Sequence, residues 1–141
     1  METLLRLFPS TLSPDVHVRR ASEQELHQLE SQPGMLAASF QLVASPEVDT
    51  SIRQAAAIYV KNRISRTWDA SLARGFSDAP SAVSDQDKEV VRSGLLPTIA
   101  SLPPTLRVHI ASAMYSIVRC DFPQAWPTLT EEIVKVLSSG E

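Results

Sequence analysis

The sequence predicts an all-α protein in which pairs of helices stack side by side as an α-solenoid. Apolar residues recur three and four positions apart through most of the 141 residues, and no run of alternating β-branched and polar residues lies between tight-turn dipeptides. Most of the ten prolines fall where one periodic segment stops and the next begins. Three segments open alike, which indicates repeated units. A single three- or four-helix bundle would explain neither this repetition nor an odd seventh helix.

Each predicted helix is a periodic segment that begins next to a proline or an acidic residue, both of which favour a helix start. The first helix ends before Pro9, and the later starts lie at Pro14–Asp15, Pro33–Gly34, Pro46 to Asp49, Asp85, Pro103–Pro104 and Pro127. Pro97 falls inside the fifth segment, where it predicts a kink or an early helix end. The predicted ranges are 2–8, 15–31, 34–44, 49–67, 85–101, 104–120 and 127–138.

Three apolar–Arg pairs mark the repeat: Val18–Arg19, Ile52–Arg53 and Leu106–Arg107, each in the first turns of a helix. The intervals between the arginines are 34 and 54 residues, and the excess of 20 is explained by DASLARGFSDAPSAVS, which has no helical period and predicts an inserted loop. Each unit is then an A helix followed by an Arg-bearing B helix. The predicted division is repeat one at 1–31, repeat two at 32–68, the loop at 69–84, repeat three at 85–126, and the A helix of a fourth repeat at 127–141.

The seventh helix has Leu129, Ile133, Val136 and Leu137 at helical spacing, which is typical of an A helix that packs against a B partner. The 141 residues contain no such partner. We therefore expect the segment after Trp126 either to fray or to bury its apolar face against a second copy of the chain.

Composition limits the function classes. The net charge of −3 and the pI near 5.6 give no excess of basic residues to neutralise phosphates, so nucleic acid is a poor candidate partner and a basic protein is easier to accommodate. The opening METLLRLFPS is too short and too charged for a signal peptide or membrane span, which predicts a cytosolic or nuclear protein. The lone Cys120, among Ile117, Val118 and Phe122, is expected to be a small buried residue.

Catalytic and cofactor patterns are missing from the sequence. His17, His27 and His109 have no cysteine or paired-carboxylate spacing that suggests zinc. The four glycines form no Gly-rich loop that could hold a nucleotide. We therefore expect no enzyme activity, no metal and no cofactor.

The fourth helix, within IRQAAAIYVKNRISRTW from Ile52 to Trp68, is apolar on most sides but keeps one polar stripe. A B helix is covered by its own A helix and by both neighbouring repeats, which leaves one side free to form the inner, concave wall and to meet a partner. The stripe positions are Arg20, Gln24, His27 and Ser31 on the second helix, Gln54, Ile58, Lys61 and Ser65 on the fourth, and Val108, Ser112, Tyr115 and Arg119 on the sixth. All of these except Ser31, Ile58 and Val108 are candidate partner-binding residues.

Other prominent residues have structural interpretations. Trp68 and Trp126 stand at helix ends and are expected to plug the core. Asp121 is expected to cap a helix or turn. Lys61 fits either an interface or a solvated position, and Asn62 either an interface or a hydrogen bond to the next repeat.

The Arg19 helix, the string AAAIYVKNRISRTW and the later DFPQAWPTL together resemble the N-terminal region of the importin-β family of nuclear transport receptors. The resemblance runs from Leu4 to Leu137, and its most specific part is the Tyr59-Val-Lys-Asn62 string with Trp68 in the second repeat. The opening METLLRLFPSTLSPD resembles most the subgroup that imports ribosomal proteins and histones. Because these receptors are several times longer, we expect an N-terminal fragment.

The resemblance implies a solenoid of HEAT repeats whose first repeats bind the small GTPase Ran in its GTP form, here along the polar stripe. It also implies a receptor that shuttles between cytoplasm and nucleus and that, at full length, imports basic protein cargo and contacts nucleoporins. Any GTP belongs to the partner, and neither nucleic acid nor membrane insertion is implied. The alternative is a generic HEAT or armadillo scaffold for another protein, which would ignore Ran in either nucleotide state.

Overall fold

The computed structural model describes residues 2–30, 32–68, 83–124 and 126–138, and within them it contains seven α-helices and no β-strand. All seven predicted helices are confirmed, with ends that differ by a few residues. Their bounds are α1 Glu2–Ser10, α2 Val16–Leu29, α3 Met35–Val43, α4 Thr50–Thr67, α5 Asp85–Ser101, α6 Pro104–Asp121 and α7 Leu129–Ser138. Most of the predicted loop at 69–84 lies outside the described residues.

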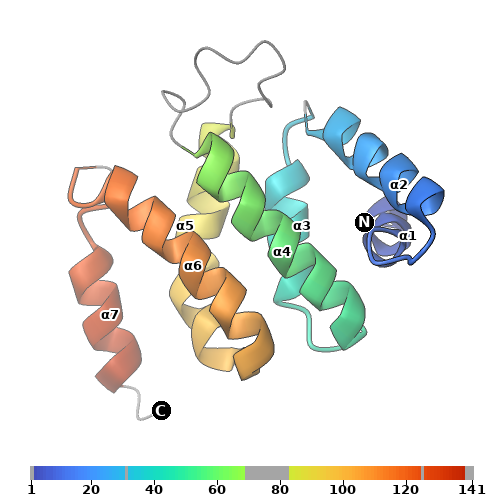
Figure 1. Ribbon diagram of the computed structural model, residues 1–141. Helices are drawn as coiled ribbons and strands as arrows, with labels where there is room; N and C mark the ends of the chain where they lie inside the picture. Colours follow the sequence, from blue (N-terminus) through green and yellow to red (C-terminus); the bar gives the residue numbers. More distant parts are fainter. Residues whose placement is uncertain (1, 31, 69–82, 125, 139–141) are drawn as a thin grey trace.

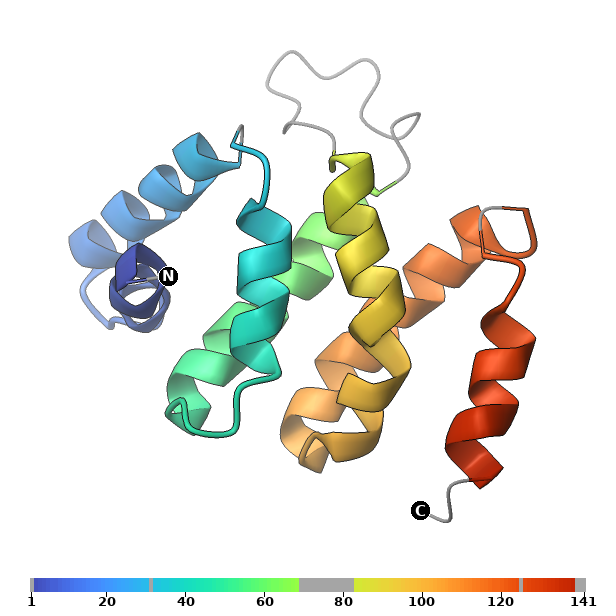
Figure 2. The ribbon, with the colours of Figure 1, turned by 180° about the vertical axis from the view of Figure 1, so that it is seen from behind.

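The helices form two layers (Figures 1 and 2). The helices α2, α4 and α6 form one layer, here called the B layer, and α1, α3, α5 and α7 form the other, the A layer. Contacts join α1 to α2, α3 to α4 and α5 to α6, and α4 also packs against α6. This is the stacked-pair arrangement that the repeated openings predict.

The run Ala55 to Ala57 explains why α4 is apolar nearly all round. These three alanines are 4%, 0% and 0% exposed, because α4 is in contact with α1, α3 and α6. Small side chains on several sides let the surrounding helices approach closely and pack without voids.

The repeated arginines hold each A helix to its B helix. Arg19 donates to the carbonyl oxygen of Ser13 (3.2 Å), Arg53 to that of Val43 (3.0 Å), and Arg107 to that of Leu102 (2.7 Å). Carbonyls at and just after the C-terminal end of a helix lack intrahelical partners, so a guanidinium from the next helix satisfies one of them. The repeated apolar–Arg pair therefore has a structural role in the turn.

Trp68 and Trp126 are buried, 1% and 3% exposed, as predicted. The prediction for Asp121 is wrong, because its carboxylate joins three helices instead of capping one. Asp121 Oδ2 accepts a hydrogen bond from Trp68 Nε1 (3.0 Å) and pairs with Arg92 Nη1 (2.6 Å). The Lys88 ammonium also lies over the Trp68 ring, 5.3 Å from its centroid. This Trp68–Asp121–Arg92 cluster links α4, α6 and α5.

A second link joins the third helix pair to the second. The backbone N–H of Gly34 donates to Asp87 Oδ2 over 3.1 Å, and Asp87 is 4% exposed. Gly34 has φ +92°, in the left-handed region that glycine adopts without strain. Asp87 therefore both stands in the first turn of α5 and ties that helix to the start of α3.

Two expectations from local sequence are wrong. The first helix does not end before Pro9 but continues through it to Ser10, whereas the fifth helix spans the predicted range 85–101 and passes through Pro97 without an early end. Cys120 is exposed, although its sequence neighbour Ile117 is fully buried. Cys120 stands in the last turn of α6, beside the exposed Arg119 and close to the exposed Phe122, so the apolar residues near it in sequence do not enclose it.

The seventh helix packs against α5 and leaves part of its apolar surface exposed. Leu129 is 4% exposed and Ile133 and Val136 are half-buried, whereas Val134 is 56% and Leu137 71% exposed. Leu137 is therefore not buried by the rest of the chain, as expected of an A helix without a B partner. That α7 begins a fourth repeat stays a prediction.

Candidate functional site

The predicted polar stripe lies on the three helices of the B layer. Every stripe position is exposed except the half-buried Ile58 and Lys61, and Ser31 lies outside the described residues. Ala56 and Ile110, on the opposite faces, are 0% exposed. The expected order of exposure is thus confirmed for Gln24, Ser112 and Arg119, while Lys61 is half-buried like Tyr59.

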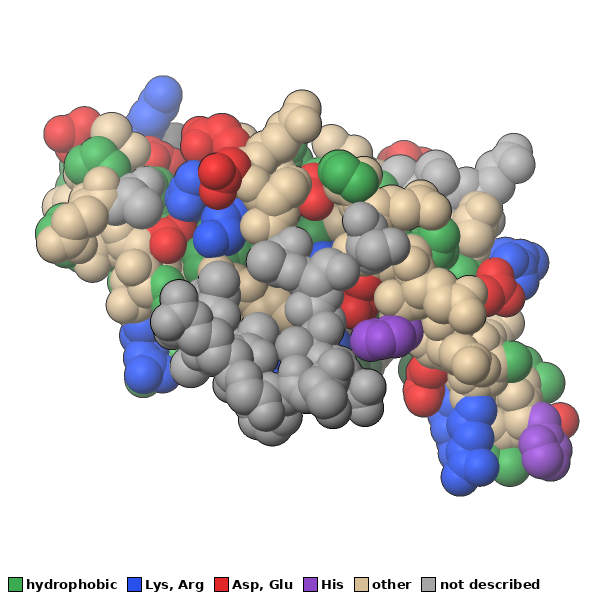
Figure 3. All heavy atoms as spheres, turned by 90° about the horizontal axis from the view of Figure 1, so that it is seen from above, with side chains coloured by type: hydrophobic (Ala, Val, Ile, Leu, Met, Phe, Trp, Pro, Cys, Tyr) green, Lys and Arg blue, Asp and Glu red, His purple; other side chains and the backbone are tan. Residues whose placement is uncertain are grey.

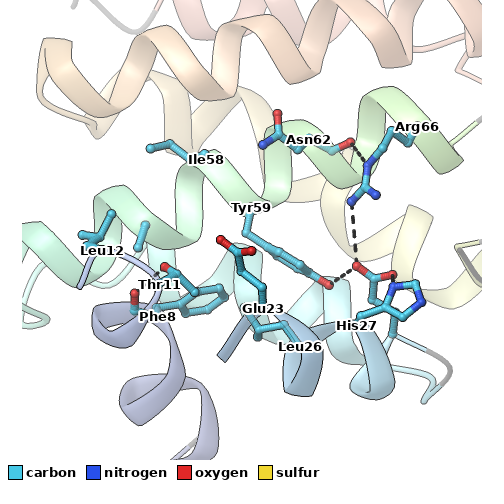
Figure 4. A pocket seen from close by; sticks show the side chains of 12 residues that line it. Phe8, Thr11, Leu12, Glu23, Leu26, His27, Ile58, Tyr59, Asn62 and Arg66 are labelled. Atoms are coloured by element: carbon cyan, nitrogen blue, oxygen red, sulfur yellow. Dashed lines mark hydrogen bonds and ion pairs between the residues drawn. The ribbon is translucent and has the colours of Figure 1, made fainter. Parts of the chain in front are cut away.

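A groove separates the first helix pair from α4, at one side of the stripe (Figure 4). It has a volume of about 390 Å³ and is lined by the C-terminal part of α1, the second half of α2 and one face of α4. Its apolar wall includes Phe8, Leu26 and Ile58, and the Phe8 and Tyr59 rings lie 5.6 Å apart between centroids. His27 and Ile58 both line this groove, so one stripe position of α2 and one of α4 face the same space.

The polar wall of the groove is organised by Glu30, which sequence analysis missed. Its carboxylate accepts a hydrogen bond from the Tyr59 hydroxyl at Oε1 (3.0 Å), with the Arg66 guanidinium 3.9 Å from the same oxygen. His27 Nδ1 lies 3.5 Å from Oε2, and Arg63 donates to the Glu30 carbonyl oxygen over 3.2 Å. Figure 4 shows Tyr59 and Arg66 of α4 and His27 of α2 at this wall of the groove.

Glu30 is 5% exposed and stands at the C-cap of α2. The negative end of a helix dipole disfavours a carboxylate there, so a Glu at that position needs tertiary partners. That misplaced charge is the signal that could have identified Glu30 from sequence. Burial, and next the nearby Glu30 charge, raise the pKa of the Tyr59 phenol, which therefore stays protonated and keeps donating its hydrogen bond.

On the side away from the groove, α4 packs against α6. Burial and the Lys61 charge lower the pKa of His109, so these two side chains of neighbouring helices interact electrostatically. Further along α6, the Arg119 guanidinium lies over the Tyr115 ring, 5.5 Å from its centroid. Tyr115 is 65% and Val108 66% exposed, so aromatic and aliphatic surface lies beside the charges. Such a mixture is common where proteins bind proteins.

No group of three His, Cys, Asp or Glu side chains that could hold a metal ion occurs in the described ranges. None of the helices among the described residues is both long enough and apolar enough to cross a membrane.

Asn62 is exposed. In the described hydrogen bonds its backbone carbonyl oxygen accepts from the side chains of Ser65 and Arg66 of the same helix.

Comparison with known proteins gives a consistent result. The family of the importin-beta N-terminal domain matches residues 22–101. The chain is 34% identical over 132 residues to the importin beta-like SAD2 homolog of Arabidopsis thaliana, a match that covers 94% of this chain and 12% of that protein. It is 33% identical over 141 residues to exportin-2 of Oreochromis niloticus, covering 100% of this chain and 14% of that protein.

Two solved structures share the fold. The exportin Cse1 in its cargo-free, cytoplasmic state aligns with a TM-score of 0.80 and 29% identity, over 95% of this chain and 14% of that one. Kap95p, in a structure with RanGDP, aligns with a TM-score of 0.72 and 24% identity, over 96% of this chain and 17% of that one. The expected place in the subgroup that imports ribosomal proteins and histones is not supported, because exportins recur among these similar proteins.

Proposed function

Because the chain belongs to the importin-β family through its N-terminal domain, we propose that it is the Ran-binding end of a nuclear transport receptor. The observation that carries this proposal is the mostly exposed polar stripe, which repeats at one register on α2, α4 and α6 while the other faces of α4 are mostly buried. A partner that spans several repeats would meet one residue set per helix. The structure of Kap95p with RanGDP supports Ran as that partner.

The proposed contacts are the stripe residues themselves. Arg20, Gln24 and His27 would meet the partner from α2, Gln54, Lys61 and Ser65 from α4, and Ser112, Tyr115 and Arg119 from α6. In the GTP form, the switch segments of a small GTPase are ordered by the γ-phosphate and can dock as a fixed surface. Hydrolysis releases that order, so GTP-selective docking converts hydrolysis into partner release.

For the direction of transport we propose export in place of the expected import. The exportin-2 relative and the exportin Cse1 structure support this change. Import is the second candidate, because the Arabidopsis relative is named importin beta-like. The chain spans only 12% to 14% of the curated relatives that it matches. Cargo binding, nucleoporin contacts and shuttling between nucleus and cytoplasm are therefore proposed for the whole receptor.

A pull-down tests Ran binding directly. Immobilised chain is incubated with Ran loaded with GTP or with GDP, and the expected result is preferential capture of the GTP form. Equal capture of both forms would contradict nucleotide selection, and capture of neither would favour the generic scaffold. For direction, the full-length receptor is added to permeabilised cells: loss of a nuclear cargo indicates export, and nuclear accumulation indicates import.

Charge reversal locates the binding surface. Lys61→Glu combined with Arg119→Glu should lower the association rate with Ran-GTP several-fold or more, because charges at a rim mainly steer encounter. Lys135→Glu makes the same reversal at an exposed position on α7 in the A layer and should leave the rate unchanged. Unchanged kinetics in the double variant would move the interface away from the stripe.

A further inference from the structure

Basic side chains outnumber acidic ones on two helices of the B layer, whereas acidic ones outnumber basic ones on two helices of the A layer. The B-layer helices α4 and α6 carry Arg53, Lys61, Arg63, Arg66, Arg107 and Arg119, against a single acid, Asp121. The A-layer helices α5 and α7 carry Asp85, Asp87, Glu89, Glu131 and Glu132, against Lys88, Arg92 and Lys135. The net charge of −3 therefore conceals an excess of basic side chains on α4 and α6.

Most carboxylates of the B layer already serve an internal contact. Asp15 and Asp49 cap their own helices by accepting the backbone N–H groups of His17 and Ser51. Glu25 pairs with Arg6 over 2.9 Å. Glu30 and Asp121 are buried, 5% and 7% exposed, where they hold the helices together. Only Glu23, at the edge of the groove, is an exposed B-layer acid for which the described contacts show no partner.

The basic side chains of the stripe are not neutralised in the same way. Among the ion pairs of the described residues, none includes Arg20, Lys61 or Arg119. The Lys61 charge acts on His109, and Arg119 rests on the exposed ring of Tyr115. At the end of the molecule seen from above, where the B-layer helices terminate, acidic and basic side chains are instead intermixed (Figure 3). In contrast, the charged side chains at the described stripe positions, Arg20, Lys61 and Arg119, are all basic.

We propose that the surface formed by Lys61, Val108, Tyr115 and Arg119 on α4 and α6 binds an acidic segment of a protein partner that also carries apolar side chains. Carboxylates of the partner would pair with Lys61 and Arg119, and its apolar side chains would cover Val108 and Tyr115. This inference rests on the proposed function, because it assigns a chemistry to the partner at the same stripe. It also reverses the expectation from net charge that a basic protein suits this chain.

The test uses the 141-residue chain and a fluorescein-labelled peptide of repeated Glu-Glu-Leu-Gly, with binding followed by fluorescence anisotropy. The expected result is saturable binding that weakens as NaCl rises from about 0.1 M to about 1 M, since the screening length falls from about 10 Å to about 3 Å. Lys61→Glu with Arg119→Glu should weaken it at least about tenfold, and Lys135→Glu by less than about twofold. If the double variant has lost its helical circular dichroism, Lys61→Gln with Arg119→Gln replaces it and should weaken binding in the same direction.

A labelled peptide of repeated Lys-Lys-Leu-Gly and a single-stranded oligonucleotide with the charge of the acidic peptide serve as controls. Three outcomes would overturn the inference: no binding of the acidic peptide, equal binding of the basic peptide, or tighter binding of the oligonucleotide. The Ran pull-down is repeated on the same variants to separate the two proposals. Peptide binding without Ran binding contradicts the proposed function and leaves the acidic-segment site standing. Ran binding without peptide binding contradicts only the inference.

Discussion

Removing the carboxylate of Asp121 tests whether the link between α4, α5 and α6 stabilises the fold. Asp121 Oδ2 accepts from buried Trp68 Nε1 and pairs with Arg92 at 2.6 Å, where the two charged side chains are 9% and 14% exposed. In Asp121→Ala the Trp68 N–H is left without its acceptor, and Arg92 loses its partner in a place with little water. Breaking a buried ion pair from one side costs about 3–5 kcal/mol, and an orphaned buried donor about 1–3 kcal/mol.

Because both losses share one carboxylate, we expect Asp121→Ala to lower the free energy of unfolding by about 3–5 kcal/mol in total. Asp121→Asn keeps an oxygen that can accept from Trp68 and should cost less. Urea unfolding followed by far-UV circular dichroism measures both variants. Glu89→Gln is the matched control, since Glu89 also pairs with Arg92 (3.3 Å) but its side chain is 73% exposed, where a pair contributes about 0–1 kcal/mol. If Asp121→Ala costs no more than the control, the cluster does not hold the helices together.

Three further predictions concern other contacts. Arg53→Ala should lower the free energy of unfolding in urea by about 2–3 kcal/mol, because Arg53 is 8% exposed and its carbonyl partner loses a buried hydrogen bond. Arg107→Ala removes the same kind of bond at an exposed side chain and should cost about 1 kcal/mol, so equal costs would contradict the role of burial. The pKa of His109 is lowered in the folded state, so on acidification the unfolded state takes up the proton first. The contribution of His109 to the free energy of unfolding is therefore complete above its ordinary pKa of about 6.5 and falls as the pH drops below that value. His109→Gln should flatten that part of the pH profile, and an unchanged profile would mean that other groups cause the pH dependence. Leu129→Ala should cost about 2–5 kcal/mol at a 4% exposed site, while Leu137→Ser, at 71% exposure, should cost under about 0.5 kcal/mol unless a second copy covers it.

Periodicity and proline spacing were sufficient to locate the helices in the sequence, because both depend on residues only a few positions apart. The ends of α5 show the limit. Ser84 caps its start as a local rule predicts, but the helix passes through Pro97. Ser93 and Pro97 lie on an exposed face, where water can bond the Ser93 carbonyl oxygen that Pro97 leaves without an N–H partner.

The stripe was predictable for the same reason, because side chains three and four residues apart lie on the same face of a helix. The groove was not. Its polar wall requires Glu30 from α2 and Tyr59 from α4 to meet, and nothing in the local pattern of either helix states how the first helix pair sits against α4.

What the sequence by itself determined is the set of helices, their pairing through Arg19, Arg53 and Arg107, and the face of each B helix that stays polar. These depend on contacts between residues close in the chain. Only the tertiary structure decided that Asp121 joins Trp68 to Arg92 and that Glu30 is buried against Tyr59. Those contacts bridge 29 to 53 positions of sequence, so the packing of helices fixes them and the helical period carries no information about them.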